Sequence, residues 1–205
     1  MTALALAETA DRTDLGAFVA RVVRLDATAT VRLRAVDGHV TAWATTPFDV
    51  LATRTVAGTL EPPDVTAPAS ALLTALTVVR SEVVDPGPGT LWPAELPPES
   101  GWALVDEVPA AEIERLTERG LEVAREHAGP HGLPTSLLDQ VVLTVTGGDT
   151  TVKVPLRCLF ALSGMGFTGG EPDPVRVSAT GSWLRLDARY GAVARRRVTS
   201  LPLLF

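Results

Sequence analysis

The sequence contains very little cysteine and very little lysine. Cys158 is the single cysteine, which excludes an internal disulfide and a zinc site built on several cysteines. Lys153 is the single lysine among 18 basic residues, and arginine supplies all the others. Together with abundant alanine and valine, this bias is typical of a G+C-rich bacterial genome. Arginine is therefore the default cation, and its presence alone does not indicate forked contacts to a ligand.

Long apolar runs and a surplus of positive charge are also absent. The longest uncharged stretch of apolar character, residues 65–79, has fifteen residues and contains Pro68. A bilayer-spanning helix needs about 20 apolar residues, so we expect no membrane association. The start, residues 1–7, has no basic residue, and Glu8 follows, which does not fit a secretory signal. We expect a cytoplasmic protein, and its net charge of −6 excludes a uniformly basic coat for nucleic acid.

The hydrophobic periodicity predicts an α+β protein with two modules, each combining helices with an antiparallel three-strand meander. Hydrophobic residues make up 46% of the chain, which is enough for a packed core. Asp37-Gly38 is typical of a two-residue hairpin turn. The first module is predicted to contain a helix over Asp14–Leu25 capped by Thr13, strands from Thr28, over His39–Ala44 and over Asp49–Val56, and a helix from Thr66 to about Val79.

A proline-rich segment separates the first module from the second. Residues 85–101 contain five prolines and three glycines, which exclude a helix or a central strand. Because the segment also carries Leu91, Trp92 and Leu96, we interpret it as an extended belt whose aromatic residue docks on one of the halves. The predicted division is therefore a first module at residues 1–84, the belt at 85–101 and a second module at 102–205.

The second module has the longer predicted series of elements. Gly120, within its long helix, suggests a close approach of another segment. The predicted order is a strand over Trp102–Glu107, a helix over Ala110–His127, one or two helical turns in Leu133–Asp139, a hairpin of Val141–Thr146 with Thr151–Val154, a buried helix from Pro155 to about Met165, and a meander of Val175–Ala179, Trp183–Ala188 and Ala192–Thr199.

The two meanders resemble each other, which predicts a weak internal repeat. Phe48–Val56 aligns without a gap with Tyr190–Val198 at an offset of 142 residues, and an aromatic residue, alanine, arginine and valine coincide. The alignment makes Arg54 equivalent to Arg196, and we expect both to pair inward or across the sheet. The alternative, that arginine-flanked strands simply look alike in so biased a composition, stays open.

The clearest functional signal is an uneven distribution of charge. Residues 151–205 carry a net charge of +5, whereas residues 1–150 carry −11. Because side chains alternate along a strand, Arg195 and Arg197 should face one side and Arg196 the other. The candidate binding patch of basic and aromatic residues comprises Arg176, Trp183, Arg185, Arg189, Tyr190, Arg195, Arg196 and Arg197.

Several functions compete for this patch. We favour a cytoplasmic, non-enzymatic interaction or regulatory protein whose arginine-rich C-terminal sheet contacts an acidic partner protein or a second copy of the chain. One alternative is a nucleic-acid-associated protein with a winged-helix-like C-terminal half that contacts the phosphate backbone. Another is a small-molecule binder or enzyme with a site between the halves, lined by Trp92, Trp102 and Trp183. The patch could also simply compensate the acidic first part of the chain.

The remaining motifs do not predict a cofactor, a metal site or a catalytic set. Residues 164–169 fit G-x-G-x-x-G, but a predicted helix precedes them and prolines follow, which is the reverse of the dinucleotide-binding arrangement. His127 and His131 have helical spacing, but a Gly-Pro pair between them breaks the helix, and no third ligand is evident. Cys158 lies in an apolar helix and is expected to be a buried core residue.

Overall fold

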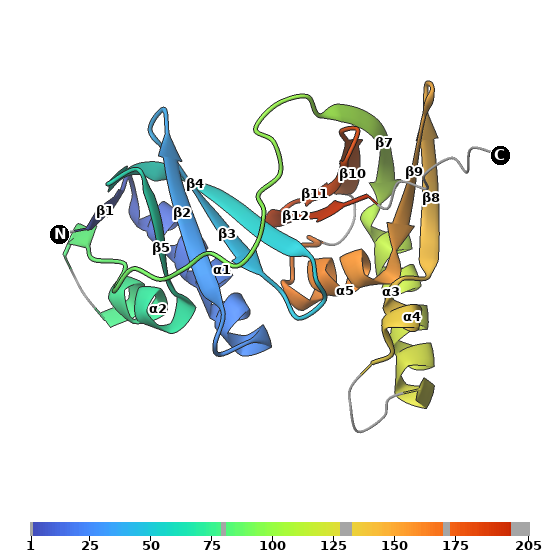
Figure 1. Cartoon of the computed structure of the whole chain (residues 1–205), viewed down its shortest axis with the longest axis horizontal. Helices are drawn as coiled ribbons and strands as arrows, with labels where there is room; N and C mark the ends of the chain where they lie inside the picture. The colour runs from blue at the N-terminus through green and yellow to red at the C-terminus, as the bar shows by residue number, and fades with distance from the viewer. Residues whose placement is uncertain (1, 79–80, 128–132, 170–172, 198–205) are drawn as a thin grey trace.

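The computed structural model describes residues 2–78, 81–127, 133–169 and 173–197, and they form an α+β fold (Figure 1). Within these ranges ten strands join in one mostly antiparallel sheet. The main path is β5-β2-β3-β4-β12-β11-β10-β7, and β1 and β6 attach beside β4. The predicted fold class is confirmed. No helix among the described residues is long and apolar enough to cross a membrane.

The first half of the chain builds one end of this sheet. Asp37 and Gly38 have φ angles of +48° and +75°, as the predicted hairpin turn between the first two strands of the meander requires. The elements of this half are β1 (Ala3–Leu6), α1 (Thr9–Leu25), β2 (Thr30–Val36), β3 (His39–Thr45), β4 (Leu51–Glu61), β5 (Asp64–Pro68), α2 (Ala69–Val78) and β6 (Val83–Val84).

Two predicted helix starts in this half are wrong. Helix α1 begins at Thr9 rather than at Asp14, because the Asp11 carboxylate accepts a hydrogen bond from the Glu8 backbone N–H at 3.1 Å and stabilises an earlier first turn. Thr66 lies in strand β5 opposite Arg32 of β2, and the helix begins three residues later at Ala69. Pairing with the open edge of β2 decides the conformation of Val65 and Thr66, whose β-branched side chains suit a strand.

The second half builds the other end of the sheet and adds a separate hairpin. The Cβ of an alanine at Gly120 would lie 2.4 Å from Leu156 Cδ1, so the predicted close approach exists and involves α5. The predicted strand end at Thr199 lies outside the described residues. The elements are β7 (Ala103–Pro109), α3 (Ala110–His127), α4 (Thr135–Leu138), the paired β8 (Val141–Gly147) and β9 (Thr150–Pro155), α5 (Leu156–Gly164), β10 (Pro174–Ala179), β11 (Trp183–Ala188) and β12 (Gly191–Arg196).

The two meanders join along their third strands, β4 and β12, in the middle of the sheet. Antiparallel pairing sets Val193 opposite Ala52 and Ala194 opposite Leu51. Helices α1 and α5 cover one face of this seam, and their buried residues, including Phe18, Val19 and Leu159, share one core with the inner side chains of both meanders. The hydrophobic effect of this shared core holds the two halves together.

The register of β4 and β12 contradicts the predicted equivalence of Arg54 and Arg196. Arg54 bonds to Asp14 of α1 and therefore lies on the helix-covered face, whereas Arg196 bonds to Glu95 of the belt on the opposite face. A slip of one residue moves a side chain to the other face of a sheet. Arg195, not Arg196, lies on the helix-facing side with Arg54, so an offset of 142 places the aligned residues on opposite faces of the sheet. The last aligned residue, Val198, lies outside the described residues.

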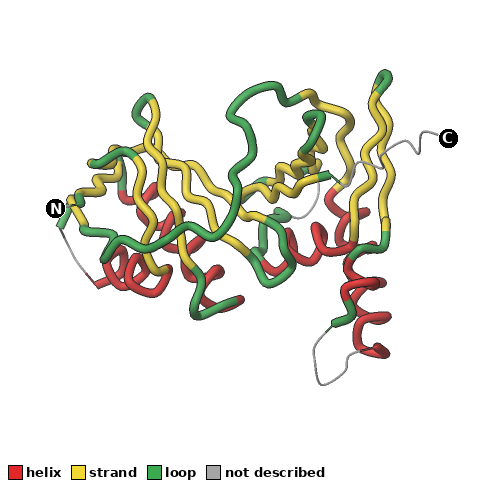
Figure 2. The backbone as a smooth tube through the Cα atoms, in the orientation of Figure 1, coloured by secondary structure: helices red, strands yellow, loops and turns green. Residues whose placement is uncertain are grey.

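The belt crosses the face of the sheet opposite to the main helices, where it runs as a long loop (Figure 2). Trp43 of β3 and Trp183 of β11 are buried beneath it, and Trp92 and Trp102 pack against them. The belt therefore docks on both halves rather than on one, which refines the predicted docking of its tryptophan.

Candidate functional site

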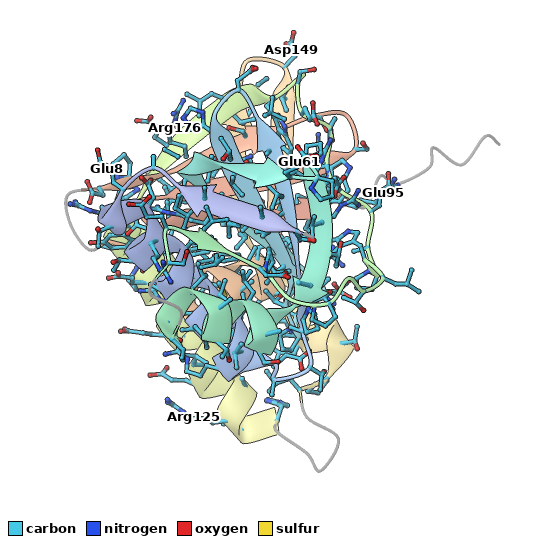
Figure 3. All side chains as sticks on the ribbon, turned by 90° about the vertical axis from the view of Figure 1, so that its left-hand side faces the viewer. Glu8, Glu61, Glu95, Arg125, Asp149 and Arg176 are labelled. Atoms are coloured by element: carbon cyan, nitrogen blue, oxygen red, sulfur yellow. The ribbon has the colours of Figure 1, made fainter. Side chains whose placement is uncertain are left out.

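The structure separates the eight predicted patch residues into two groups. In the first group, each arginine forms an ion pair with a nearby carboxylate. The pairs are Arg176 with Glu107 at 3.6 Å, Arg185 with Asp187 at 2.8 Å, and Arg189 with Asp173 at 2.6 Å. The Arg189 guanidinium also lies over the ring of Tyr190, and hydrogen bonding to Asp173 raises the pKa of Arg189. Figure 3 shows Arg176 far from Glu95, the belt residue that pairs with Arg196 of the second group.

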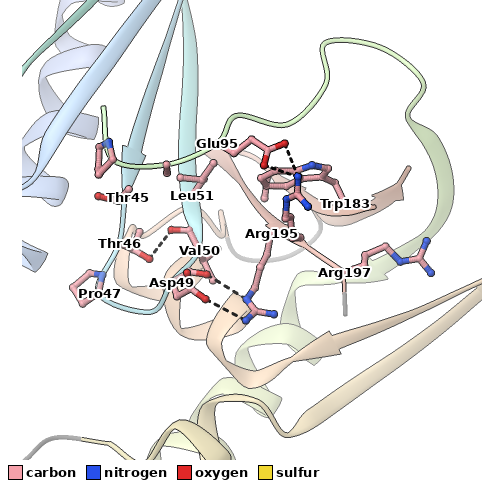
Figure 4. Close-up of a pocket in the computed structure, with 14 residues that line it drawn as sticks. Thr45, Thr46, Pro47, Asp49, Val50, Leu51, Glu95, Trp183, Arg195 and Arg197 are labelled. Carbon is pink, nitrogen blue, oxygen red and sulfur yellow. Dashed lines mark hydrogen bonds and ion pairs between the residues drawn. The ribbon is translucent and has the colours of Figure 1, made fainter. Parts of the chain in front are cut away.

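The second group consists of Trp183 and the three consecutive arginines at the end of β12. Arg195 donates to the Asp49 carboxylate at 3.2 Å, and Arg196 bonds to Glu95 and lies 5.7 Å from the ring centre of Trp183. Arg195 and Arg197 are directed differently in Figure 4, and Arg197 points away from Asp49. Arg195 and Arg196 face opposite sides as predicted, but the predicted pairing of Arg197 with the side of Arg195 is wrong. Arg197 follows the end of β12 and bonds to the carbonyls of Thr180 and Thr151 instead. Arg196 was expected to pair inward or across the sheet, whereas its ion-pair partner, Glu95, lies on the belt.

These residues surround a cavity at the seam, which we call the seam pocket (Figure 4). It has a volume of about 760 Å³. Its walls come from the β3–β4 turn, the belt and the end of β12, so three parts of the chain that are distant in sequence build it. Its lining combines apolar side chains, among them Leu51, Val50 and Trp183, with the three arginines and with the carboxylates of Asp49 and Glu95.

The predicted tryptophan-lined site between the halves is only partly formed. All three tryptophans gather at the seam, but Trp92 and Trp102 pack into the cluster with Trp43 and Leu51. Trp183 alone of the three lines the seam pocket. The Trp92 Nε1 atom is buried without a hydrogen-bond partner among the described residues. The cluster therefore acts mainly as a small second core that anchors the belt.

Sequence reasoning missed the ion network beneath the pocket. Arg157 of α5 has a side chain only 5% exposed, yet it forms an ion pair with Asp139 at 2.7 Å and donates to the Phe48 carbonyl at 2.8 Å. Asp49 lies 3.6 Å from Arg157 and also binds Arg195, so this network ties the β3–β4 turn to the second half. An arginine inside an otherwise apolar helix was the available signal, because a buried guanidinium needs partners.

Asp49 has a φ angle of +57°, a conformation that non-glycine residues rarely adopt but that aspartate tolerates best. The left-handed turn directs its backbone carbonyl as well as its carboxylate toward Arg195, which bonds to both at 3.2 Å. The turn between β3 and β4 is therefore shaped to present acceptors to the last strand of the other half.

The structure places the other candidate groups in structural roles. Cys158 is fully buried, and burial raises the pKa of its thiol to about 12, so it remains protonated at neutral pH. Gly166, with a φ angle of +59°, belongs to the exit from α5, since helix precedes it. His127 bonds to the carbonyl of Val123, while His131 lies outside the described residues. Among the described residues, no three His, Cys, Asp or Glu side chains converge as metal ligands do.

The winged-helix alternative is wrong. A recognition helix must offer polar side chains to a DNA groove. Helix α5, which precedes the last three strands, is buried from Leu156 to Leu162 and packs against the sheet.

Comparisons with known proteins identify a family and a fold. Residues 97–200 match the family model described as Domain of unknown function (DUF8185), and residues 1–95 match Domain of unknown function (DUF8010). A search of curated proteins finds no match.

Solved structures of bacterial sliding clamps share the fold over nearly the whole chain. The DNA polymerase sliding clamp from Caulobacter crescentus has a TM-score of 0.60 and 14% identity, with 99% of this chain and 67% of that chain covered. The DNA polymerase III subunit beta from Pseudomonas aeruginosa gives 0.60 and 13%, with 99% and 66% covered. The DNA polymerase sliding clamp from Bacillus subtilis gives 0.60 and 13%, with 98% and 66% covered.

The chain thus spans about two thirds of the length of these clamps, between 64% and 67% of the sliding-clamp chains that it matches. At this level of identity the likeness concerns the fold alone. A repeat-like arrangement of two units is consistent with that fold.

Proposed function

This chain belongs to the DUF8185 family, and we propose that it is a cytoplasmic, non-enzymatic interaction protein that binds an acidic segment of a partner protein in the seam pocket. Within this proposal residues 1–84 and 102–205 are two modules that share one core and are linked by the belt at 85–101. The matches of two family models, to residues 1–95 and 97–200, support that division.

One observation carries the proposal: the seam pocket places three arginines beside the apolar side chains of Val50, Leu51 and Trp183 at the junction of both halves. A volume of about 760 Å³ suits several side chains of a bound segment. Arg196 is stacked near Trp183, which holds its guanidinium at the rim. Acidic side chains would pair with the rim, and apolar side chains would contact Leu51 and Trp183.

Glu95 of the belt already occupies Arg196 in the way a partner's carboxylate would. Both side chains of this ion pair are more than half exposed, so the pair contributes about 0–1 kcal/mol and is readily exchanged for another carboxylate. The contact supports a site that recognises carboxylates, and it makes Glu95 a competitor of the proposed ligand.

The test uses a fluorescein-labelled peptide of alternating Glu and Leu residues, with a Gln-for-Glu version as its uncharged control. Arg196→Ala should weaken binding by about fivefold, the effect of losing roughly 1 kcal/mol of ion pairing. Arg176→Ala is a matched control, because Arg176 and Arg196 are both 58% exposed and each pairs with an exposed glutamate. Fluorescence anisotropy at two salt concentrations measures the affinity.

Belt variants provide a second matched pair. Glu95→Gln frees Arg196 and should strengthen peptide binding up to about fivefold. Glu99→Gln breaks the similar ion pair with Arg34, at 2.8 Å and away from the seam pocket, and should leave binding unchanged. The proposal is refuted if neither peptide version binds, or if Arg176→Ala and Arg196→Ala reduce binding equally. Peptide-independent dimers in size-exclusion chromatography with light scattering, lost in Arg196→Ala, would instead assign the pocket to a second copy.

Association with DNA is a second candidate, favoured by the sliding-clamp fold of the solved relatives. Five arginines of the predicted patch already have a carboxylate partner within the chain, and DNA phosphates would have to displace these carboxylates just as an acidic segment must displace Glu95: Arg176, Arg185, Arg189, Arg195 and Arg196. Retention of labelled duplex DNA with a steep salt dependence would support it, and no retention at low salt would remove it.

A further inference from the structure

A second cavity, with a volume of about 700 Å³, lies on the side of β12 that faces the β8–β9 hairpin. We call it the hairpin cavity. Val152 and Val154 of β9 are buried, so the alternate residues Thr151 and Lys153 project from the other face and line the cavity. Gly181 of the β10–β11 turn lines the cavity from another side. The hairpin cavity shares Arg195, Arg196 and Arg197 with the seam pocket, and its other lining residues differ from those of the seam pocket.

Arg197 is held in place without being neutralised. Its Nη1 donates to the Thr180 carbonyl at 2.9 Å and its Nη2 to the Thr151 carbonyl at 2.8 Å. Carbonyl groups carry no net charge, and a guanidinium has five N–H donors, so donors and the full positive charge remain available. The bonds bridge β9 and the β10–β11 turn, which fixes the guanidinium before any ligand arrives.

Lys153 brings a second uncompensated charge to the same cavity. Within the described ranges, neither Lys153 nor Arg197 has a carboxylate within ion-pairing distance. Asp139 is the carboxylate that lines the cavity, and it is bound to Arg157 at 2.7 Å and lies 3.7 Å from Arg195. Two cations that share a cavity repel each other, and an anion between them would remove that repulsion.

We propose that the hairpin cavity binds a phosphate monoester of a small organic molecule. A phosphoryl group carries nearly two negative charges at neutral pH, which match the charges of Lys153 and Arg197, and it offers three acceptor oxygens to their donors. The volume exceeds that of a phosphate ion and lies within the range of small-molecule sites, so the organic part occupies the remainder beside Leu184 and Pro155.

The probes are inorganic phosphate, phenyl phosphate and phenyl sulfate, titrated calorimetrically into the full chain at pH 7.5 and constant ionic strength. Phenyl phosphate should bind most tightly, because it supplies both the dianion and the organic group. Phenyl sulfate, a monoanion, should bind more weakly. The affinity for phenyl phosphate should also fall below about pH 6, where the phosphoryl group takes up a proton.

Lys153→Ala should weaken phenyl phosphate binding roughly tenfold, and Lys153→Arg should restore most of it. Lys153 is exposed and makes no described hydrogen bond through its side chain, so this change should not impair folding. Arg176→Ala is the control cation outside the cavity, and Arg197→Ala, checked for native circular dichroism, is the second test. The proposal is overturned if phenyl phosphate binds no better than phenyl sulfate, or if Lys153→Ala and Arg176→Ala bind it equally. Neither result depends on whether an acidic peptide occupies the seam pocket.

Discussion

The buried ion network predicts that removing Asp139 destabilises the fold more than removing Arg157 does. Arg157 is only 5% exposed, whereas the side chains of Asp139 and Asp49 are 48% and 80% exposed. Asp139→Ala would leave the buried guanidinium with the Phe48 carbonyl and with the more distant Asp49 as its one remaining carboxylate among the described residues, and we expect it to destabilise the protein by about 3–5 kcal/mol. Arg157→Met leaves carboxylates that water can solvate and one carbonyl, that of Phe48, without its donor. We expect it to cost about 1–2 kcal/mol.

Urea unfolding followed by tryptophan fluorescence measures both changes, since Trp43 and Trp183 are buried at the seam. The double variant Asp139→Ala with Arg157→Met should cost less than the sum of the single variants, because the second change removes the stranded charge that the first created. Asp139→Asn, which keeps an acceptor oxygen, should lie between wild type and Asp139→Ala. An Arg157→Met variant that is less stable than Asp139→Ala would refute the reasoning, because the ion pair would then contribute net stability beyond its desolvation.

Three other predictions follow from packing and titration. Gly147→Ala should destabilise the protein by about 1–3 kcal/mol in urea unfolding, because the new Cβ would lie 2.0 Å from a carbonyl oxygen of β7. Gly181 has open space around it, so Gly181→Ala should leave the stability nearly unchanged. The Cys158 thiol, with its pKa raised by burial to about 12, should react with Ellman's reagent at pH 8 only after unfolding, and rapid labelling of the native protein would contradict this. Hydrogen bonding to Arg32 lowers the pKa of Asp64, so this carboxylate stabilises the fold above its unfolded-state pKa and the effect is lost as the pH falls. Asp64→Asn should therefore flatten the acid-side decline in melting temperature, and parallel pH curves for the two proteins would contradict the assignment.

Local patterns were sufficient to predict most elements of this fold. The period of two located both meanders, and the proline content located the belt. Strand β1, however, was not predicted. It is four residues long, and its conformation depends on antiparallel pairing with β4 and β6, whose residues are distant in sequence. The predicted helix start at Thr66 was wrong for the same reason. Pairing with the free edge of β2 outweighed the helical propensity of the residues that follow Thr66.

In the candidate site, too, the sequence allowed local features to be predicted but not contacts between distant segments. Alternation along β12 correctly separated Arg195 from Arg196, since it depends only on the pleat of the strand. The partners of these arginines were not predictable. Asp49 reaches Arg195 through a left-handed turn, and Glu95 reaches Arg196 along a belt without regular structure. A charge count shows how many cations a segment has, but ion pairing depends on contacts that only the folded chain creates.

The surplus positive charge of the second half therefore has two roles. Arg195 and Arg196 meet Asp49 of the first half and Glu95 of the belt, so part of the surplus joins segments that the chain keeps apart in sequence. Lys153 and Arg197 have no carboxylate partner among the described residues, and we propose that their charge serves an anionic ligand. Arg195, Arg196 and Arg197 line both cavities, so the two cavities meet at the end of β12. A ligand in one cavity lies within a Debye length, about 8–10 Å, of cations that line the other, so anions bound in both should weaken each other electrostatically.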